Sequence, residues 1–141
     1  MGVKRHSSIT ETEELINDID TSFKAKTGIN WVICLKEKKT PIGYAGVWKI
    51  INEHFKGEIG YALNSNYCGN GYMTEALRQI IKFSFNELCL HRLEANVDPN
   101  NSNSLKLLMK FNFKKEAFLR EDYFINGKFT NSIILSKLAN E

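Results

Sequence analysis

The chain has 141 residues, 43% of them hydrophobic and 25% charged, with two prolines and nine glycines, a composition that fits one soluble globular domain and excludes a disordered or fibrous protein. Its net charge of +3 is spread along the chain without a basic stripe, so we expect no nucleic-acid partner. No apolar run approaches the roughly 18 residues that span a membrane, and the basic N-terminus leads into no signal peptide, so we expect no membrane partner either.

The first predicted element is a helix that begins at Thr10. Thr10 and Glu13 have the spacing of a capping box, in which each side chain satisfies a free backbone N–H group of the other residue. The helix is expected to end near residues 27–28. Its apolar face consists of Leu15, Ile16, Ile19 and Phe23.

Three strands are expected next, at residues 31–35, 42–51 and 57–63, because each stretch is rich in β-branched and aromatic residues. The polar connections at 36–40 and 52–56 are too short to hold helical crossovers. The three strands should therefore form an antiparallel meander.

A long helix is predicted over residues 72–89, after a polar, glycine-containing loop at 64–71. A strand follows at 92–97, and a turn-rich linker at 98–103 offers N-caps for a short helix at 104–111. The apolar face of the long helix consists of Met73, Leu77, Ile80, Ile81, Ser84 and Leu88.

The C-terminal part is predicted to be a hairpin with strands at 113–120 and 129–138. Asn126 and Gly127 form a typical signal for the turn between them. No repeat or linker divides the chain, so we expect residues 1–141 to form a single domain. The fold class is therefore α/β (α+β): a mixed, mostly antiparallel sheet with a central parallel β-α-β unit and with helices on both faces.

The loop before the long helix has the properties of an anion site. A helix N-terminus leaves its first backbone N–H groups unpaired and carries about half a positive charge. Gly69 and Gly71 permit unusual φ angles and a close approach of a ligand, and phosphate oxygens are natural acceptors for such N–H groups. A tight turn with no ligand explains the glycines equally well, so the loop alone leaves both interpretations open.

Two common phosphate-binding motifs do not fit this loop. Thr74 stands where a Gly-x-Gly-x-x-Gly dinucleotide motif needs its third glycine, and no Gly-Lys-Ser/Thr follows as in a Walker loop. A nucleotide-binding domain that holds a different phosphate ligand remains an alternative.

The cysteines and histidines indicate no metal site. Cys34, Cys68 and Cys89 contain no Cys-x-x-Cys pair, and the histidines stand at no metal-ligand spacing to them. We expect three reduced thiols in a cytoplasmic protein. Nothing near Cys68 in the sequence activates its thiol as a nucleophile.

The residues on both sides of the loop carry a family resemblance. They read EIGYAL at 58–63 and YCGNGYMTEAL at 67–77, followed by NSNS at 101–104 and FNF at 111–113. In this order they resemble the core of the GNAT-superfamily N-acetyltransferases, and within these the branch that includes the Rim-type acetyltransferases of ribosomal-protein N-termini. The similarity extends over residues 31–138.

The resemblance implies the GNAT fold and acetyl-CoA as co-substrate. In this family the amides of the glycine loop bind the pyrophosphate of acetyl-CoA, and the pantetheine arm lies between the strands that correspond to 57–63 and 92–97. The residues implied here are Asn66, Gly69, Asn70, Gly71, Tyr72, Met73 and Thr74 around the pyrophosphate, Ala62 and Leu63 along the pantetheine arm, and Asn101 and Ser104 near the thioester.

Three departures from the family pattern bear on function. Asn66 stands where the family usually has Gln or Arg, so its shorter, neutral side chain is expected to reach the phosphates poorly. Asn112 stands where the family usually has glycine and is expected to form a left-handed helix cap. The family also has a strand and a helix before the segment at 10–26 that are expected to be missing here and that usually help to form the acceptor-side wall.

Acetyl transfer to an amine needs a base, a donor for the developing oxyanion and a group that stabilises the leaving thiolate. Glu58 matches an acidic position that resembles the family's base; the alternative is an ordinary solvated carboxylate. Ser104 is the candidate acid or thiolate stabiliser, although a helix N-cap explains a serine there as well. Tyr123 and Tyr72 are alternative acids, and the amide of Leu63 or a neighbour is the expected oxyanion donor.

The sequence thus predicts direct acetyl transfer from acetyl-CoA to a primary amine, such as a protein N-terminal α-amine or a small-molecule amine, with no acyl-enzyme on Cys68. The alternative is a CoA-binding or interaction module without catalysis, which the missing elements and Asn66 suggest. The acceptor side is expected to include Trp48, His54 and Phe55. A sheet left exposed by the missing elements would favour a homodimer.

Overall fold

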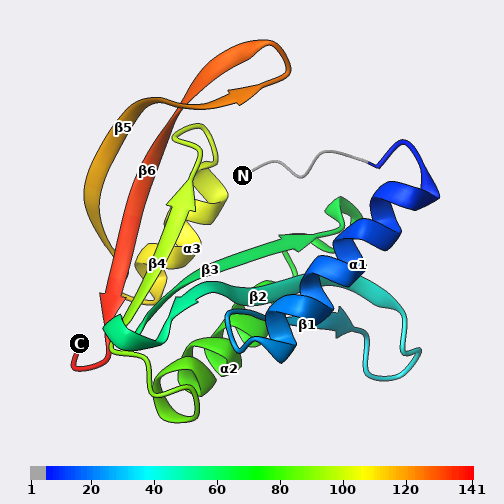
Figure 1. Ribbon diagram of the computed structural model, residues 1–141, viewed down its shortest axis with the longest axis horizontal. Helices are drawn as coiled ribbons and strands as arrows, with labels where there is room; N and C mark the ends of the chain where they lie inside the picture. The colour runs from blue at the N-terminus through cyan, green and yellow to red at the C-terminus, as the bar shows by residue number, and fades with distance from the viewer. Residues whose placement is uncertain (1–5) are drawn as a thin grey trace.

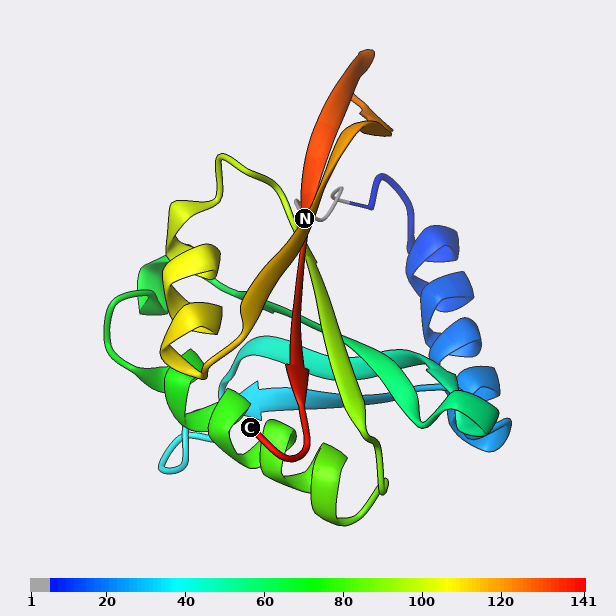
Figure 2. The same ribbon diagram turned by 90° about the vertical axis from the view of Figure 1, so that its left-hand side faces the viewer.

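The computed structural model describes residues 6–141 (Figure 1). The α-helices of this part of the chain are α1 (Ile9–Lys24), α2 (Tyr72–Asn86) and α3 (Ser102–Lys110), and two short 3-10 helices are η1 (Asn52–His54) and η2 (Ser65–Tyr67). Its strands are β1 (Ile29–Cys34), β2 (Pro41–Ile51), β3 (Lys56–Leu63), β4 (Arg92–Val97), β5 (Lys114–Ile125) and β6 (Lys128–Leu138). They form one sheet in the order β1-β2-β3-β4-β6-β5, with α2 and α3 on one face and α1 on the other (Figure 2).

The sheet consists of two three-stranded arms. β1, β2 and β3 form the antiparallel meander that the sequence predicts, and β4, β6 and β5 form a second antiparallel arm. β3 and β4 join the arms as a parallel pair connected through α2. This arrangement confirms the predicted mixed sheet with a central parallel β-α-β unit.

The two arms are paired over a very short stretch. The paired residues are Lys56 with Arg92, Gly57 with Leu93, and Glu58 with Glu94. Beyond them, residues 59–63 of β3 and 95–97 of β4 diverge (Figure 1). We call the paired stretch the vertex and the diverging stretch the splay.

Helix α2 covers the first arm and supplies much of the core. Leu77 is fully buried, and burying a leucine contributes about 1.5–3 kcal/mol. The buried positions are Met73, Leu77, Ile80, Ile81 and Ser84, all of them predicted, whereas Leu88 is only partly buried. The helix ends at Asn86, before the predicted end at residue 89: the Leu88 N–H donates to the Phe83 carbonyl, five residues back, at 3.1 Å, and Cys89 has a φ of 53°.

The predicted capping box at Thr10 and Glu13 is wrong. Ser8 is the N-cap of α1, and its Oγ accepts a hydrogen bond of 3.3 Å from the backbone N–H of Glu11. The Glu11 carboxylate in turn accepts from the backbone N–H of Ser7 at 2.6 Å. The spacing of a capping box occurs at both places in the sequence, and the earlier serine begins the helix.

The predicted apolar face of α1 is largely exposed. Leu15, Ile16 and Phe23 have exposures of 44%, 58% and 59%, and no residue of the helix is fully buried. The segment after the helix is hydrogen-bonded to β2: the Thr27 carbonyl accepts from the Ile50 N–H at 2.9 Å. α1 therefore adds little to the core.

The C-terminal hairpin has the predicted turn but a longer first strand. Asn126 and Gly127 have φ angles of 50° and 76°, as a type I′ turn requires. β5 continues to Ile125 instead of ending at residue 120. An irregularity between Leu119 and Tyr123, with a positive φ at the intervening Glu121, lets the strand resume its pairing with β6.

Helix α3 begins at Ser102 and not at residue 104 as predicted. Asn101 is its N-cap, and the Asn101 Oδ1 accepts from the backbone N–H of Ser104 at 3.1 Å. The alternative interpretation of Ser104 as the N-cap is therefore wrong. At the other end, Asn112 has a φ of 64°, which confirms the left-handed cap.

Charged side chains tie the strands together at the vertex. Arg92 donates from Nε to Glu94 at 2.7 Å, and its two terminal nitrogens donate to Glu116 of β5 at 3.1 and 2.5 Å. Lys56 of β3 lies 4.0 Å from Glu94. The hydrogen bonds from Arg92, and then from Ser136, lower the pKa of Glu116 to about 2.

We expect Glu116→Gln to lower the free energy of unfolding at pH 7 by roughly 1 kcal/mol, a discounted value because the carboxylate is 43% exposed. The lowered pKa sets the pH dependence: the stabilisation is present above the unfolded-state pKa of 4.5 and is lost as the pH falls toward about 2. Urea denaturation at about pH 7 and about pH 3 measures both effects.

The matched control is Glu53→Gln, because Glu53 is an exposed carboxylate with no ion pair within residues 6–141. Equal losses for the two variants would contradict the prediction. So would a loss for Glu116→Gln that does not shrink in acid.

Candidate active site

The loop between β3 and α2 is braced by its own asparagines. The Asn64 Oδ1 accepts from the backbone N–H of Asn66 at 3.0 Å. The Asn70 Nδ2 donates to the carbonyls of Tyr67 and Cys68 at 3.4 and 3.3 Å. These side chains hold the loop from within and leave its backbone N–H groups for other partners.

The backbone N–H groups at the start of α2 are open to a ligand. Gly69 and Gly71 both have a φ of 81°, and a Cβ added at either would meet no atom within 4 Å. Gly71 is the N-cap and supplies no side-chain bond to the helix. Within the described chain, the N–H groups of residues 69–74 have no protein acceptor. Such consecutive amides at a helix N-terminus have the arrangement of an anion site.

The loop and the first turn of α2 themselves supply no positively charged side chain. Asn66 is exposed and neutral, and residues 64–77 contain no Lys or Arg. Thr74 is half-buried in the first turn of α2. Cys68 is exposed, and Cys34, Cys68 and Cys89 are all free thiols. An anion at this loop would be held by backbone N–H groups and by the helix dipole.

Ala62 and Leu63 lie in the splay, where the pantetheine arm is expected. They pair with Tyr44 and Gly43 of β2, and neither pairs with β4. Residues 95–97 of β4 likewise pair with β6 alone. Both edges of the splay thus have backbone that the sheet leaves unpaired, and an extended ligand with amide groups is able to bond to such edges.

Glu58 stands at the vertex and is not an ordinary solvated carboxylate, since its side chain is 17% exposed. Its Oε1 accepts from the Trp48 Nε1 at 3.1 Å, and its Oε2 accepts from the Lys49 Nζ at 2.8 Å. The hydrogen bond to Glu58 raises the pKa of Lys49, against the opposing effect of burial. Each carboxylate oxygen keeps a second lone pair for an incoming proton.

A backbone irregularity brings Lys49 to Glu58. The pairing of β2 with β3 shifts between Trp48 and Ile51, and Lys49 has a φ of 49°. This change of direction in β2 accompanies the contacts of both Trp48 and Lys49 with Glu58. No spacing rule in the sequence indicates it.

Ser104 meets a residue that sequence reasoning missed. Its Oγ lies 2.7 Å from the Oη of Tyr61, a β3 residue 43 positions earlier. Asn101, implied to lie near the thioester, uses its Oδ1 to cap α3. The signal for Tyr61 is absent from local patterns, because a contact over such a separation depends on how α3 packs against β3.

Glu58 and Ser104 lie on opposite faces of β3. Side chains alternate along a strand, so Tyr61, three positions after Glu58, points to the other face. Tyr61 contacts Ser104 on the face that α2 and α3 cover (Figure 2). A group held in the splay would therefore be reached by Ser104 from one face and by Glu58 from the other.

The aromatic residues expected on the acceptor side separate into two places. Trp48 lies over β3 inside the splay, because a Cβ added at Gly60 would stand 1.9 Å from its Cζ2. His54 and Phe55 are exposed in the turn between β2 and β3. The Phe55 carbonyl accepts from the Arg92 N–H at 3.1 Å, so this turn lies behind the vertex.

Tyr123 lies on the same side as Glu58. Its Oη accepts from the Asn96 Nδ2 of β4 at 3.1 Å. Burial raises the pKa of the Tyr123 hydroxyl, and the charges of Lys49 and Glu58 also act on it. This position suits a residue that lines an acceptor groove more than one that protonates a thiolate on the Ser104 face.

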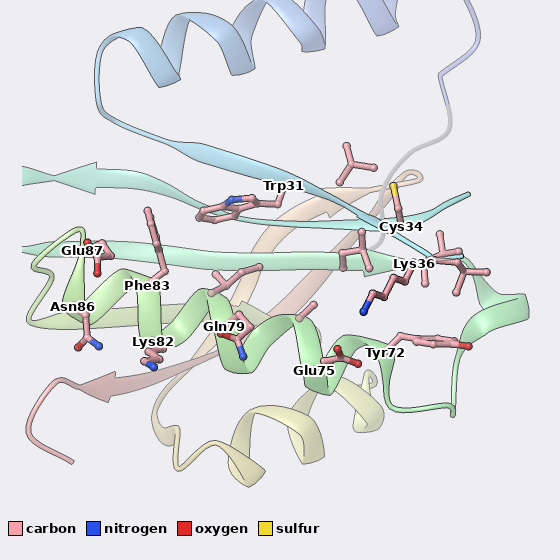
Figure 3. A pocket seen from close by; sticks show the side chains of 16 residues that line it. Trp31, Cys34, Lys36, Tyr72, Glu75, Gln79, Lys82, Phe83, Asn86 and Glu87 are labelled. Carbon is pink, nitrogen blue, oxygen red and sulfur yellow. The ribbon is translucent and has the colours of Figure 1, made fainter. Parts of the chain in front are cut away.

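A groove of about 610 Å³ lies away from the splay, between β1 and α2 (Figure 3). Trp31 and Phe83 contact each other edge to face in it, with ring centroids 5.4 Å apart. Tyr72 lies at one end of this groove (Figure 3). Because β1 is two strands from the splay, the structure argues against the Tyr72 side chain as the acid.

The described residues 6–141 contain no group of three or more His, Cys, Asp or Glu side chains that could hold a metal ion. None of their helices is long and apolar enough to cross a bilayer.

Comparison with known proteins agrees with this geometry. Residues 1–114 match the family model described as an acetyltransferase (GNAT) domain. The chain belongs to the GNAT acetyltransferase family. It is therefore an acyltransferase, and GNAT acetyltransferases take the acetyl group from acetyl-CoA.

Three proteins similar to this GNAT chain carry names that give different acceptors or none. The uncharacterized N-acetyltransferase p20 of Bacillus licheniformis is 35% identical over 91% of this chain and 70% of its own length. The ribosomal-protein-S5-alanine acetyltransferase of Vibrio fischeri has a structure with a TM-score of 0.88 and 26% identity over 99% of this chain and 79% of its own. The spermidine N(1)-acetyltransferase of Escherichia coli (strain K12) is 29% identical over 64% of this chain and 49% of its own length.

We expect Gly71→Ala to weaken acetyl-CoA binding to this GNAT chain at least tenfold, measured by calorimetry. The methyl group would stand among the open amides. The backbone φ of 81° at residue 71 would in addition cost an alanine about 1–2 kcal/mol of strain. Gly127→Ala is the matched control: its φ is 76°, and its Cβ also meets no atom within 4 Å.

The two variants should lose similar amounts of thermal stability, and only Gly71→Ala should lose affinity. Equal affinities would show that the loop at residues 69–74 does not hold the ligand.

Proposed function

We propose that this chain transfers the acetyl group of acetyl-CoA directly to a primary amine, either a protein N-terminal α-amine or a small-molecule amine. The observation that carries the proposal is the run of unpaired amides at residues 69–74 beside a splay with Glu58 at its vertex. The amides at residues 69–74 suit a pyrophosphate, and Glu58 at the vertex supplies a carboxylate that can take a proton.

The bound donor would span these features. The amides of residues 69–73 would hold the pyrophosphate, with the Thr74 hydroxyl as support and Asn66 contributing little. The pantetheine arm would bond to backbone near Ala62 and Leu63. Asn101 and Ser104 would lie near the thioester. We also propose that the whole chain acts as one acetyltransferase domain.

The reaction would proceed without an acyl-enzyme. The amine nitrogen forms a bond to the acetyl carbon while its proton passes to Glu58, and the backbone N–H of Leu63 or a neighbour stabilises the oxyanion. The C–S bond then breaks, its electron pair goes to sulfur, and the Ser104 hydroxyl hydrogen-bonds to the thiolate. A protein α-amine has a pKa near 8, against about 10.4 for lysine, so an α-amine needs less help from Glu58 near neutral pH.

The names of the relatives indicate two classes of acceptor, a ribosomal-protein alanine and spermidine. We favour the peptide α-amine because its lower pKa demands less of Glu58. Alignment coverage does not separate the two classes, since a spermidine N-acetyltransferase of Vibrio cholerae also aligns with 96% of this chain. The cytoplasmic location and the homodimer stay predictions. The observation that supports the homodimer is that β1 is an edge strand of the sheet formed by the described residues.

An amine panel tests the proposal. Thiol release from acetyl-CoA is followed with an alanine-initiated peptide, spermidine and a lysine derivative, beside calorimetric binding of acetyl-CoA. Turnover with the peptide is the expected result. Binding without thiol release would support the non-catalytic CoA-binding alternative, and absence of binding would reject both.

We expect Glu58→Gln to lower kcat/KM by about 100-fold, the usual contribution of a general base. Glu94→Gln is the matched control, because Glu94 is the direct partner of Glu58 on β4 and its change removes the same charge. Kinetics across about pH 6–9 with each variant and with Ser104→Ala check the assignment. Unchanged kcat/KM over that range for both Glu58→Gln and Ser104→Ala would rule it out.

A further inference from the structure

Two hydroxyl groups bridge the arms of the sheet on the face away from Glu58. Tyr61 belongs to the part of β3 that has left β4, and Ser104 belongs to α3, which follows β4 in the chain. Their oxygens are 2.7 Å apart, and either atom is able to be the donor. This contact therefore joins elements from the two sides of the splay.

Each partner is held in place by the surrounding fold. The Tyr61 ring packs against the hydrophobic core, so its hydroxyl has a fixed position. Ser104 sits in the first turn of α3, where the Asn101 cap takes its backbone N–H and leaves its hydroxyl out of the capping. Within the described residues, the Ser104 hydroxyl thus has one hydrogen-bond partner, the Tyr61 hydroxyl.

The direction of this hydrogen bond decides what Ser104 is able to do. A serine hydroxyl has one hydrogen and two lone pairs. If Ser104 donates to Tyr61, it has no hydrogen left for a leaving thiolate. If Tyr61 donates to Ser104, the serine hydrogen is directed elsewhere. A phenol is the more acidic of the two hydroxyls and hence the better donor, which favours the second arrangement.

We propose that Tyr61 is a positioning residue that donates its hydroxyl hydrogen to the Ser104 Oγ and so turns the Ser104 hydrogen toward the leaving sulfur of CoA. The inference rests on the proposed function. Tyr61 loses no proton in the reaction: the amine proton goes to Glu58, and the electron pair of the C–S bond goes to a sulfur that Ser104 stabilises. Burial raises the pKa of Tyr61, which keeps its hydroxyl protonated across neutral pH.

A double-mutant cycle of Tyr61→Phe and Ser104→Ala tests the proposal. Tyr61→Phe keeps the ring and its packing and removes only the hydroxyl. We expect kcat of this variant to fall about tenfold. Its affinity for acetyl-CoA should change less than about twofold, and its melting temperature by less than about 2 °C. In the double variant, Tyr61→Phe should add almost nothing to the loss caused by Ser104→Ala, because Tyr61 acts through Ser104.

Additive losses, or an unchanged kcat in Tyr61→Phe, would overturn the role of Tyr61. If Tyr61→Phe lost acetyl-CoA affinity and thermal stability together with kcat, the Tyr61 hydroxyl would only stabilise the splay, and this result would also overturn the proposed role. Tyr123→Phe serves as the comparison, since a loss confined to that variant would move the role to the Glu58 face. A wild-type chain that binds acetyl-CoA and acetylates no amine would reject the proposed function itself, and with it this inference.

Discussion

The short parallel pairing of β3 with β4 is the constraint on which the rest of the molecule depends. Three residue pairs hold the two arms together, and the ion pair of Lys56 on β3 with Glu94 on β4, at 4.0 Å, also crosses between them. If the strands stayed paired to their ends, Ala62 and Leu63 would have neighbours on both sides and there would be no splay. The divergence thus creates the splay, and β3 continues from it into the glycine loop at the start of α2.

In the first turn of α3, the cap formed by Asn101 leaves the Ser104 hydroxyl available for another contact. Asn101 and Ser104 are both good helix caps, and either would satisfy the start of a helix near this place. Since Asn101 takes the cap, the Ser104 hydroxyl is released to meet Tyr61. The choice of cap, which is worth about 1 kcal/mol in stability, therefore also decides which side chain is available for the contact with Tyr61.

The sequence predicted well those features that depend on neighbouring residues. The apolar face of α2 and the turn at Asn126 and Gly127 follow from local spacing and backbone sterics. The left-handed Asn112 was expected from the family pattern, which usually has glycine there. The N-cap of α1 was missed because two matching capping patterns lie two positions apart. The exposed face of α1 and the partner of Tyr61 could not be predicted, because tertiary packing decides them. The family resemblance located the glycine loop, but only the structure reveals that its amides have no acceptor among residues 6–141.

The open amides at residues 69–74 have a consequence for how a ligand arrives. They carry partial charges, and residues 64–77 contain no Lys or Arg. The attraction of a helix N-terminus for an anion falls off within its first turn, whereas full charges act over longer distances. The loop is thus suited to hold an anion that has already reached it, and it contributes little to drawing the anion in from a distance.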